Sequence, residues 1–567
     1  MPAAYTNGYR PFDFADFSLG LNLRDKSDAV KDGEAIDLLN VTFTERGAIR
    51  QRDGFADFTT ADLGQRVDSM VAHYTAGGAR QLVIGAGTRI DVLDQAGTLT
   101  PGIAGMTRGP WTFAQFGDPT RELVFCANGA DPMVSWNGAA FANGLAVATV
   151  NGIAAQAMPK AGAICVTAST PGSTSGTNAS NRLVATAYGT LATGGPAGAQ
   201  STPSRVHFSN AGDPFRWETD GDIPSGRGRN FIDLTPGDGE YIIAAVTWRE
   251  LVFIFKQTKF FVLWGEGIGA NSTPTFQVRE VVNNVGLACP QAVAVGRDGV
   301  YFMNRRGVYR TSGGDPVLLS DVISPMWTQD PDPYFRSSPI NLGQLDRVRA
   351  LWAMERFYLA VPTGASADND RVLVYDTQHN WWSLYDMPAA ALASFRSTDR
   401  PDLHIGYSSS LPARVGRQLL GLNTDRGQPI TSRWRSGWSD YNSSQAKTIR
   451  ETKLWGTGAV VVRFSTDFYL NARAALDTSF TPAYLWTYAK LTAAGGTYAD
   501  LKLAYGNYDA LTEREATRPL VERAMVRYAA RGHVFSTEFA NSPSAPSWAI
   551  HRVARHLREI REPSAAA

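Results

Sequence analysis

A repeated pair of short apolar segments, bounded by turns, limits the possible folds of this sequence more than any other feature. Examples are "RQLVIGAG" (80–87) followed by "RIDVLDQAG" (89–97), and "RFYLAVP" (356–362) followed by "DRVLVYDT" (370–377). Short runs rich in Val, Ile, Phe, Tyr and Trp between turn signals predict β-strands. Seven such groups can be anchored at Val83, Val124, Val184, Val252, Val300, Tyr358 and His404. The sequence therefore predicts an all-β fold.

The spacing of these groups indicates a β-propeller. The anchors recur roughly every 40–70 residues, and propeller blades recur about every 40–50 residues. The longer intervals contain the polar stretches 168–181 and 190–203, which we expect at a blade rim. A further apolar segment precedes most groups, so each group can supply the four strands of a blade. We predict seven blades, with six as the alternative and a β-sandwich as the competing architecture.

Three regions follow from this pattern: an N-terminal arm (1–34), a propeller (35–427) and a C-terminal β-sandwich-like domain (428–567). The seventh strand group is incomplete, and a propeller ring has no open edge. We therefore expect residues 35–55 to complete the last blade.

Two segments of the second half allow more local predictions. The stretch 518–541 reads as two long strands joined at Gly532. In the tail, Ile550, Val553, Leu557 and Ile560 follow a spacing that favours a helix, although a final strand stays open. Trp381 and Trp382 are neighbours on a predicted strand, so they face opposite sides of a blade, and we expect both to be buried.

Composition and charge bound the possible functions. The 567 residues are 44% hydrophobic with a net charge of +1, so a large core is expected and general attraction to nucleic acid or membrane is not. No apolar run is long enough for a transmembrane helix, and the first residues do not resemble a signal peptide. The scattered cysteines Cys126, Cys165 and Cys289 are expected to be buried thiols.

No motif of the sequence predicts catalysis, a cofactor or a metal site. The "GEGIGA" stretch (265–270) lacks the following helix that a phosphate-binding loop needs. His551 and His556 do not have the spacing of two zinc ligands on one helix face. The carboxylates form no recognisable glycosidase pair. We therefore expect a protein that is not an enzyme, with a propeller hydrolase or carbohydrate-binding protein as the alternative.

Arginines mixed with apolar residues mark two candidate interface segments. They occur in "TERGAIRQR" (44–52) and in the tail "HRVARHLREIRE" (551–562). Arginine suits interfaces because its planar fork pairs with carboxylates and is weakly hydrated. The predicted interface residues are Arg46, Arg50, Arg52, Arg552, Arg555 and Arg558.

The early segment resembles the opening of bacteriophage tail nozzle, or tail hub, proteins. The matching positions between residues 17 and 55 are Gly20, Leu21, Asn22, Leu39, Asn40, Val41, Arg46, Gly47, Arg52 and Gly54. The final "RDG" departs from the family's usual "RPG" at Asp53. Stretches 204–218, 283–310 and 372–386 are similar to later blades of the family, so the resemblance runs from residue 17 to about residue 468.

The resemblance implies a structural protein of the virion, made in the host cytoplasm. It implies a ring, a hexamer in the family, below the adaptor that joins the tail to the portal. Phage DNA would pass through the ring lumen without sequence-specific binding, and fibres or spikes would dock around it. No cofactor is implied.

Overall fold

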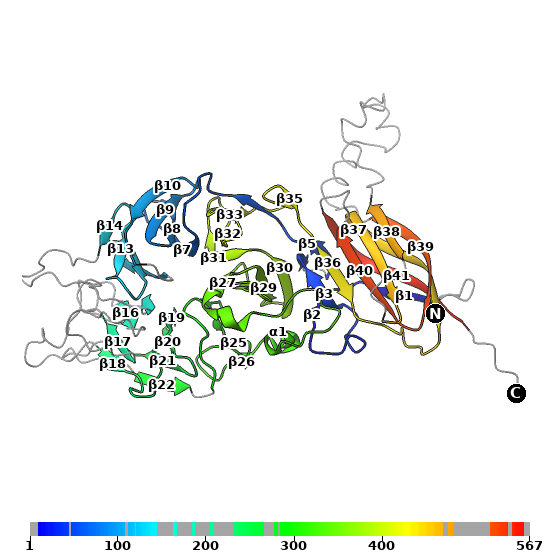
Figure 1. The fold of residues 1–567 in the computed structure, drawn as a ribbon, viewed down its shortest axis with the longest axis horizontal. Helices are drawn as coiled ribbons and strands as arrows, with labels where there is room; N and C mark the ends of the chain where they lie inside the picture. Colours follow the sequence, from blue (N-terminus) through cyan, green and yellow to red (C-terminus); the bar gives the residue numbers. More distant parts are fainter. Residues whose placement is uncertain are drawn as a thin grey trace, which may run out of the picture.

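The protein is described here by a computed structural model (Figure 1). The described residues are 10–44, 47–107, 111–118, 121–143, 163–166, 184–187, 204–208, 231–265, 277–281, 284–468, 474–480, 522–541 and 547–560. Their helices are short: η1 (Asp321–Ile323), α1 (Pro325–Thr328) and η2 (Leu342–Arg347). None of the helices in these ranges is long and apolar enough to span a membrane. The remaining regular structure is β-strand, which confirms the all-β prediction.

Seven four-stranded antiparallel sheets, here called blades 1 to 7, make up one part of the molecule. Blades 1 to 3 are β7 (Val67–Tyr74), β8 (Arg80–Ala86), β9 (Arg89–Asp94), β10 (Leu99–Ile103); β11 (Thr112–Asp118), β12 (Arg121–Ala127), β13 (Val134–Trp136), β14 (Phe141–Asn143); β15 (Ala163–Val166), β16 (Val184–Ala187), β17 (Arg205–Phe208), β18 (Phe231–Asp233). Blades 4 to 6 are β19 (Ala244–Trp248), β20 (Leu251–Phe255), β21 (Phe260–Trp264), β22 (Gln277–Val281); β23 (Val293–Val295), β24 (Val300–Met303), β25 (Val308–Thr311), β26 (Val317–Leu318); β27 (Arg349–Ala353), β28 (Arg356–Val361), β29 (Arg371–Asp376), β30 (Trp381–Asp386). Blade 7 is β31 (Ala389–Phe395), β32 (Asp402–Tyr407), β33 (Val415–Gln418) and β6 (Phe55–Asp57).

The blades form a closed ring. The first strand of each blade contacts the first strand of the next, from β7 through β11, β15, β19, β23, β27 and β31 and back to β7. Ring closure by consecutive strand groups is the arrangement of a β-propeller. The predicted propeller is therefore confirmed.

An N-terminal strand closes the ring, but it is much shorter than predicted. Only β6 pairs with β33, with Phe55 opposite Gln418, and Asp57 on β6 binds the guanidinium groups of Arg414 and Arg426 at 2.8 Å each. Residues 35–55 as a whole do not complete blade 7, because the strands before β6 pair with the C-terminal half of the chain. The physical reason is pairing: β3 (Glu34–Leu39) lies between β2 (Gly20–Leu21) and β36 (Arg433–Ser436) in a second sheet, with every residue buried, so neither of its edges is left for blade 7.

A second, eleven-stranded sheet lies beside the propeller (Figure 1). It combines both ends of the chain: β1 (Arg10–Phe14), β2 (Gly20–Leu21), β3, β4 (Val41–Phe43), β5 (Ile49–Gln51), β36 (Arg433–Ser436), β37 (Lys447–Thr466), β38 (Ala474–Phe480), β39 (Glu522–Gly532), β40 (Phe535–Asn541) and β41 (Trp548–Glu559). A small hairpin of β34 (Thr424–Asp425) and β35 (Gln428–Pro429) precedes β36. The predicted N-terminal arm, 1–34, is thus corrected: its described strands β1 and β2 belong to this C-terminal domain.

The C-terminal sheet folds over on itself, as a sandwich does. The first half of the long strand β37 pairs with β39 and β41, and its second half pairs with β38 and β40. Although β40 and β41 flank different halves, their side chains meet: Arg555 Nη2 on β41 donates to Thr537 Oγ1 on β40 at 2.6 Å. The two long strands predicted within 518–541 are confirmed as β39 and β40.

The tail is a strand, and the favoured helix is wrong. β41 pairs with β37 along its whole length, with Trp455 opposite Arg552 and Gly456 opposite Ile550. The skipped residue between them is a β-bulge, which changes the side of the sheet on which later side chains lie. Ile550 before the bulge and Val553 and Leu557 after it are all buried, so a strand acquires a spacing typical of a helix.

The propeller and the C-terminal domain share one hydrophobic core. That core contains Phe302 and Trp382 from the blades together with Trp434 and Phe539 from the C-terminal sheet. Trp381 and Trp382 are 2% and 0% exposed, which confirms their predicted burial. The two regions are therefore expected to unfold together, because neither keeps its apolar surface covered without the other.

Candidate functional site

A buried arginine joins the two regions at the start of the ring. Arg52 is 2% exposed, and its Nε donates to Asn40 Oδ1 at 2.8 Å. Its two terminal nitrogens reach the Asp425 carboxylate at 3.0 and 2.6 Å, and Nη2 also reaches the Asp386 carbonyl at 3.0 Å. Because Asp386 ends blade 6 and Asn40 lies between β3 and β4, this one side chain ties the propeller to the C-terminal sheet. We call Asn40, Arg52, Asp386 and Asp425 the junction.

Asn40 completes the junction through both atoms of its amide. Its backbone has φ 55°, a left-handed conformation that asparagine adopts more readily than most residues. Its Oδ1 accepts from Arg52 and from the Asp386 backbone at 2.7 Å, and its Nδ2 donates to the Thr431 carbonyl at 2.7 Å. A single short side chain therefore holds three separate segments together.

Two glycines of the opening segment allow close backbone contacts, Gly20 with β30 of blade 6 and Gly54 with Thr424 of the hairpin next to the junction. A Cβ on Gly20, which has φ +77°, would lie 2.7 Å from Trp381 Cβ and 2.9 Å from the Trp382 nitrogen. A Cβ on Gly54 would lie 2.0 Å from the Thr424 carbonyl oxygen. Both positions exclude a side chain unless the chain moves, which explains glycine at each.

A second set of ion pairs lies where Arg336, in the segment 319–347 between β26 and β27, meets Glu538 of the C-terminal sheet; the Arg433–Asp37 and Arg463–Glu538 pairs beside it are within that sheet. Arg433 Nε lies 2.6 Å from the fully buried Asp37, and Arg336 Nη2 lies 2.6 Å from Glu538. Arg463 also pairs with Glu538, at 2.5 Å. Burial alone would raise the pKa of Glu538, but these two arginines hold it below its ordinary value. Both regions are thus fixed by paired charges as well as by the shared core.

The predicted interface arginines of the opening segment do not form one external surface. Arg46 lies outside the described residues. Arg50 is partly exposed and pairs with Asp53 at 3.1 Å. Arg52 is inside the junction, so the prediction is corrected there: its contacts are intramolecular and its burial leaves nothing for a second subunit.

Of the predicted interface arginines of the tail, one is buried and two are exposed. Arg555 is 3% exposed and bonds to Tyr441 and Thr537 inside the sandwich, so the prediction is corrected for this residue as well. Arg552 and Arg558 are exposed on β41, and Arg552 pairs with Asp13 of β1 at 2.8 Å. These two stay candidates for contacts with another chain.

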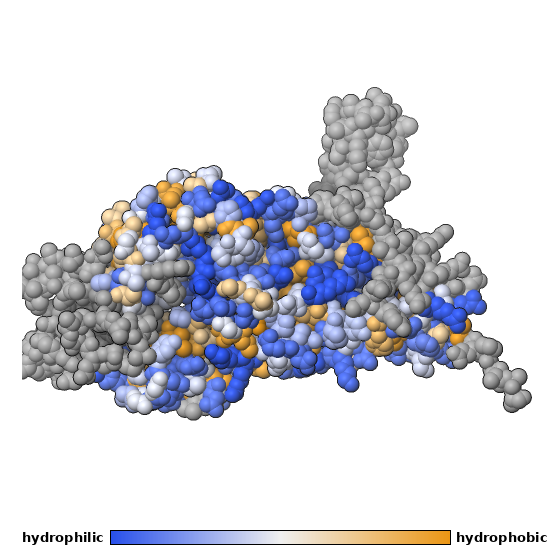
Figure 2. All heavy atoms as spheres, viewed as in Figure 1, coloured by the Kyte–Doolittle hydropathy of each residue, from blue (hydrophilic) through white to orange (hydrophobic). Residues whose placement is uncertain are grey.

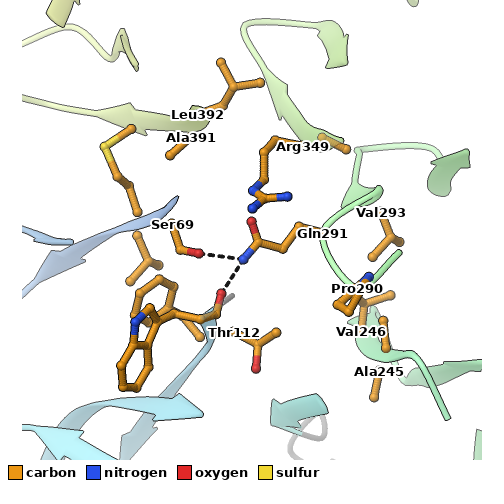
Figure 3. Close-up of a pocket in the computed structure, with 16 residues that line it drawn as sticks. Ser69, Thr112, Ala245, Val246, Pro290, Gln291, Val293, Arg349, Ala391 and Leu392 are labelled. Atoms are coloured by element: carbon orange, nitrogen blue, oxygen red, sulfur yellow. Dashed lines mark hydrogen bonds between the residues drawn. The ribbon is translucent and has the colours of Figure 1, made fainter. Parts of the chain in front are cut away.

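The propeller channel contains a cavity of about 230 Å³, and sequence reasoning did not find it. Figure 3 shows the inner strands converging on it, with Ser69, Gln291 and Arg349 at its polar side. Gln291 Nε2 donates to Ser69 Oγ and to the Trp111 carbonyl, so it bridges blade 5 to blades 1 and 2. The only sequence signal for this site was the polar Gln and Arg in segments otherwise predicted as apolar inner strands.

The two described cysteines are as expected. Cys126 and Cys289 are buried free thiols, and burial raises the pKa of both above the ordinary value. The side chain of Cys165 lies outside the described residues.

Comparisons with known proteins give no family. No family model and no curated protein matches the sequence. Among solved structures, a streptogramin B lyase is 11% identical with a TM-score of 0.36, covering 64% of this chain and 96% of its own. A virginiamycin B lyase from Staphylococcus aureus is 10% identical with a TM-score of 0.33, covering 73% of this chain and 100% of its own. At these levels of similarity neither lyase bears on the activity of this chain.

Proposed function

We propose that this chain is a structural subunit of a bacteriophage tail, and not an enzyme. It would form the nozzle ring below the adaptor, with phage DNA passing through the ring lumen and fibres or spikes docking outside. By the family resemblance the ring is a hexamer. The observation that carries the proposal is the junction, because two positions that resemble the nozzle family, Asn40 and Arg52, form it.

The positions of the family-like residues in the structure support the proposal. Asn40 and Arg52 bond to each other and to Asp386 of blade 6. Gly20 packs against Trp381 and Trp382 of the same blade, and Gly54 packs against Thr424, next to Asp425 of the junction. Such a contact keeps two regions in one fixed orientation. A ring subunit that bears the force of DNA ejection needs that property, whereas a surface recognition motif would not need to be buried.

The channel of a single propeller is not the proposed path for DNA. Gln291 spans it by bonding to Ser69 and to the Trp111 carbonyl, and the remaining cavity is only about 230 Å³. DNA would therefore pass between subunits, through the lumen of the ring. The described lining of the cavity contains one arginine and no carboxylate, which suits the proposed structural role better than a glycosidase site with two carboxylates.

Subunit contacts in this ring would be mostly polar. On the face seen in Figure 2, hydrophilic residues predominate and hydrophobic ones form separate patches. Exposed Arg552 and Arg558 on β41 are the described interface candidates, and Asp13 beside Arg552 could exchange partners across subunits.

Immunogold labelling of virions tests the proposal. Particles that package the gene for this chain are stained with an antibody raised against the purified protein, and an antibody against the capsid protein is the control. We expect label on the tail axis, next to the portal, with several copies per particle. Label on the capsid, a single copy per tail, or no label on intact particles would refute the nozzle role.

A further inference from the structure

The propeller channel has a buried cationic group, Arg349, in its wall. Arg349, the first residue of β27, is 5% exposed. Its Nε donates to the Asp68 carbonyl at 3.0 Å, and its Nη1 donates to the carbonyls of Asp346 and Val348 at 2.9 Å each. Within the described ranges no carboxylate lies at ion-pair distance from it. Burial lowers the pKa of Arg349, yet an arginine stays charged at neutral pH.

A buried charge satisfied only by carbonyls is unusual. Arg52 shows the usual solution in the same molecule, since the Asp425 carboxylate meets its fork. Taking a charge out of water is costly unless an opposite charge accompanies it. Arg349 keeps one terminal nitrogen, Nη2, with no hydrogen-bond partner among the described residues, and Figure 3 shows the guanidinium pointing into the cavity.

The cavity around this group has a polar side and an apolar side. On the same polar side of the cavity, the hydroxyl of Ser69 accepts from Gln291, so its own proton is available to an acceptor in the cavity. The remaining wall is largely apolar and comes from the inner strands of several blades. It consists of Met70, Val71, Trp111, Phe113, Ala244, Ala245, Val246, Pro290, Val293, Ala350, Ala391 and Leu392, together with the hydroxyl-bearing Thr112.

We propose that the channel binds a small organic monocarboxylate, with its carboxylate against Arg349 and Ser69 and its apolar end against Met70, Phe113 and Leu392. One cation balances one carboxylate, and the planar fork of arginine matches its two oxygens. The apolar wall would leave a phosphate dianion both undercompensated and poorly solvated. The site does not depend on the role of the chain in a tail.

A chain-length series of carboxylates tests this site. Formate, acetate, propionate and butyrate are titrated into the full-length protein at constant ionic strength, and binding is followed by calorimetry and by the melting temperature. We expect saturable binding that becomes about fourfold tighter for each added methylene, because each is worth about 0.8 kcal/mol when buried. Sodium phosphate and chloride at the same ionic strength are the comparison anions.

Two variants and a matched control locate the binding. Ser69→Ala removes one donor to the carboxylate and is expected to weaken butyrate about tenfold. Arg349→Gln is expected to abolish binding; if it does not fold, Ser69→Ala decides. Arg417→Gln, which breaks an ion pair with Asp402 on β32, is expected to bind butyrate as the natural protein does.

Several results would overturn the site. They are the absence of saturable binding by any carboxylate, an equal effect of phosphate and butyrate, no dependence on chain length, or unchanged butyrate affinity in Ser69→Ala.

Discussion

The propeller and the C-terminal sheet are built in opposite ways. Six of the seven blades take four strands that are consecutive in the chain, and only blade 7 borrows one from far away. The C-terminal sheet instead combines strands from the first 51 residues with strands after residue 432. The propeller is a local repeat, whereas the C-terminal sheet depends on contacts between distant segments. The junction lies where these two kinds of organisation meet, so breaking it should affect the C-terminal sheet more.

The largest expected effect comes from removing Arg52. Arg52→Ala removes one of the two donors to Asn40 Oδ1 and the guanidinium donor to the Asp386 carbonyl, and it separates Asp425 from its ion-pair partner. We expect the free energy of unfolding to fall by about 3–5 kcal/mol, measured by urea titration. We also expect a fluorescent probe placed in the C-terminal sheet to report unfolding at a lower urea concentration than a probe placed in the propeller.

Arg50→Ala is the matched control for that experiment. Arg50 is two residues away, but its pair with Asp53 is partly exposed, so a loss of about 0–1 kcal/mol is expected. Equal losses of unfolding free energy for Arg50→Ala and Arg52→Ala would show that the junction stabilises the fold no more than a partly exposed ion pair does.

A comparable effect is expected inside blade 6. Trp382→Ala removes a fully buried ring whose Nε1 donates to the Leu319 carbonyl at 3.1 Å, and Trp381→Ala removes a ring packed on Phe43. Each change should cost about 3–5 kcal/mol in thermal or urea unfolding. Because both rings lie in the shared core, the two regions should still unfold together. Unchanged melting of both variants would contradict the assignment of these rings to the core.

A smaller effect is expected from acid, acting on blade 7. Burial lowers the pKa of His404 from 6.5 to about 4, with the Asp402 carbonyl and Arg417 close to the ring. The unfolded chain therefore binds a proton between pH 6.5 and 4 that the folded chain refuses. The resulting contribution of His404 to the free energy of unfolding is fully present above pH 6.5 and is lost as the pH falls towards 4. It amounts to about 3 kcal/mol at most. His404→Leu should flatten stability against pH in this window, and an unchanged slope would exclude His404 as the cause.

The smallest effect is expected on the exposed face of β41. Arg552→Ala breaks an ion pair with Asp13 and a cation–π contact with the Trp455 ring, both near the surface, so the melting temperature of the isolated chain should fall only slightly. A clear loss of stability would show that β1 depends on this pair and that the C-terminal sheet is weaker than its core suggests.

The contrast between a local repeat and a sheet of distant segments also explains which features could be predicted from the sequence. Strand groups repeated along the chain showed the propeller, and adjacent Trp381 and Trp382 showed a core strand, because these patterns are local. The placement of β3 and β5 could not be predicted, since their partners β36 and β41 lie about 400 and 500 residues further along the chain. The bulge before Arg552 interrupts the alternation of buried and exposed residues in β41, so the tail had the spacing of a helix. The partners of Arg52 are far apart in the sequence, so this buried junction residue could not be distinguished from an interface residue.

Differential scanning calorimetry of the unmodified protein tests most directly whether the two regions form one body. The shared core and the junction predict a single transition, with a calorimetric enthalpy equal to the van't Hoff enthalpy. The same transition should be reported by probes placed in blade 2 and in β41. Two separate transitions, one for each region, would contradict the account.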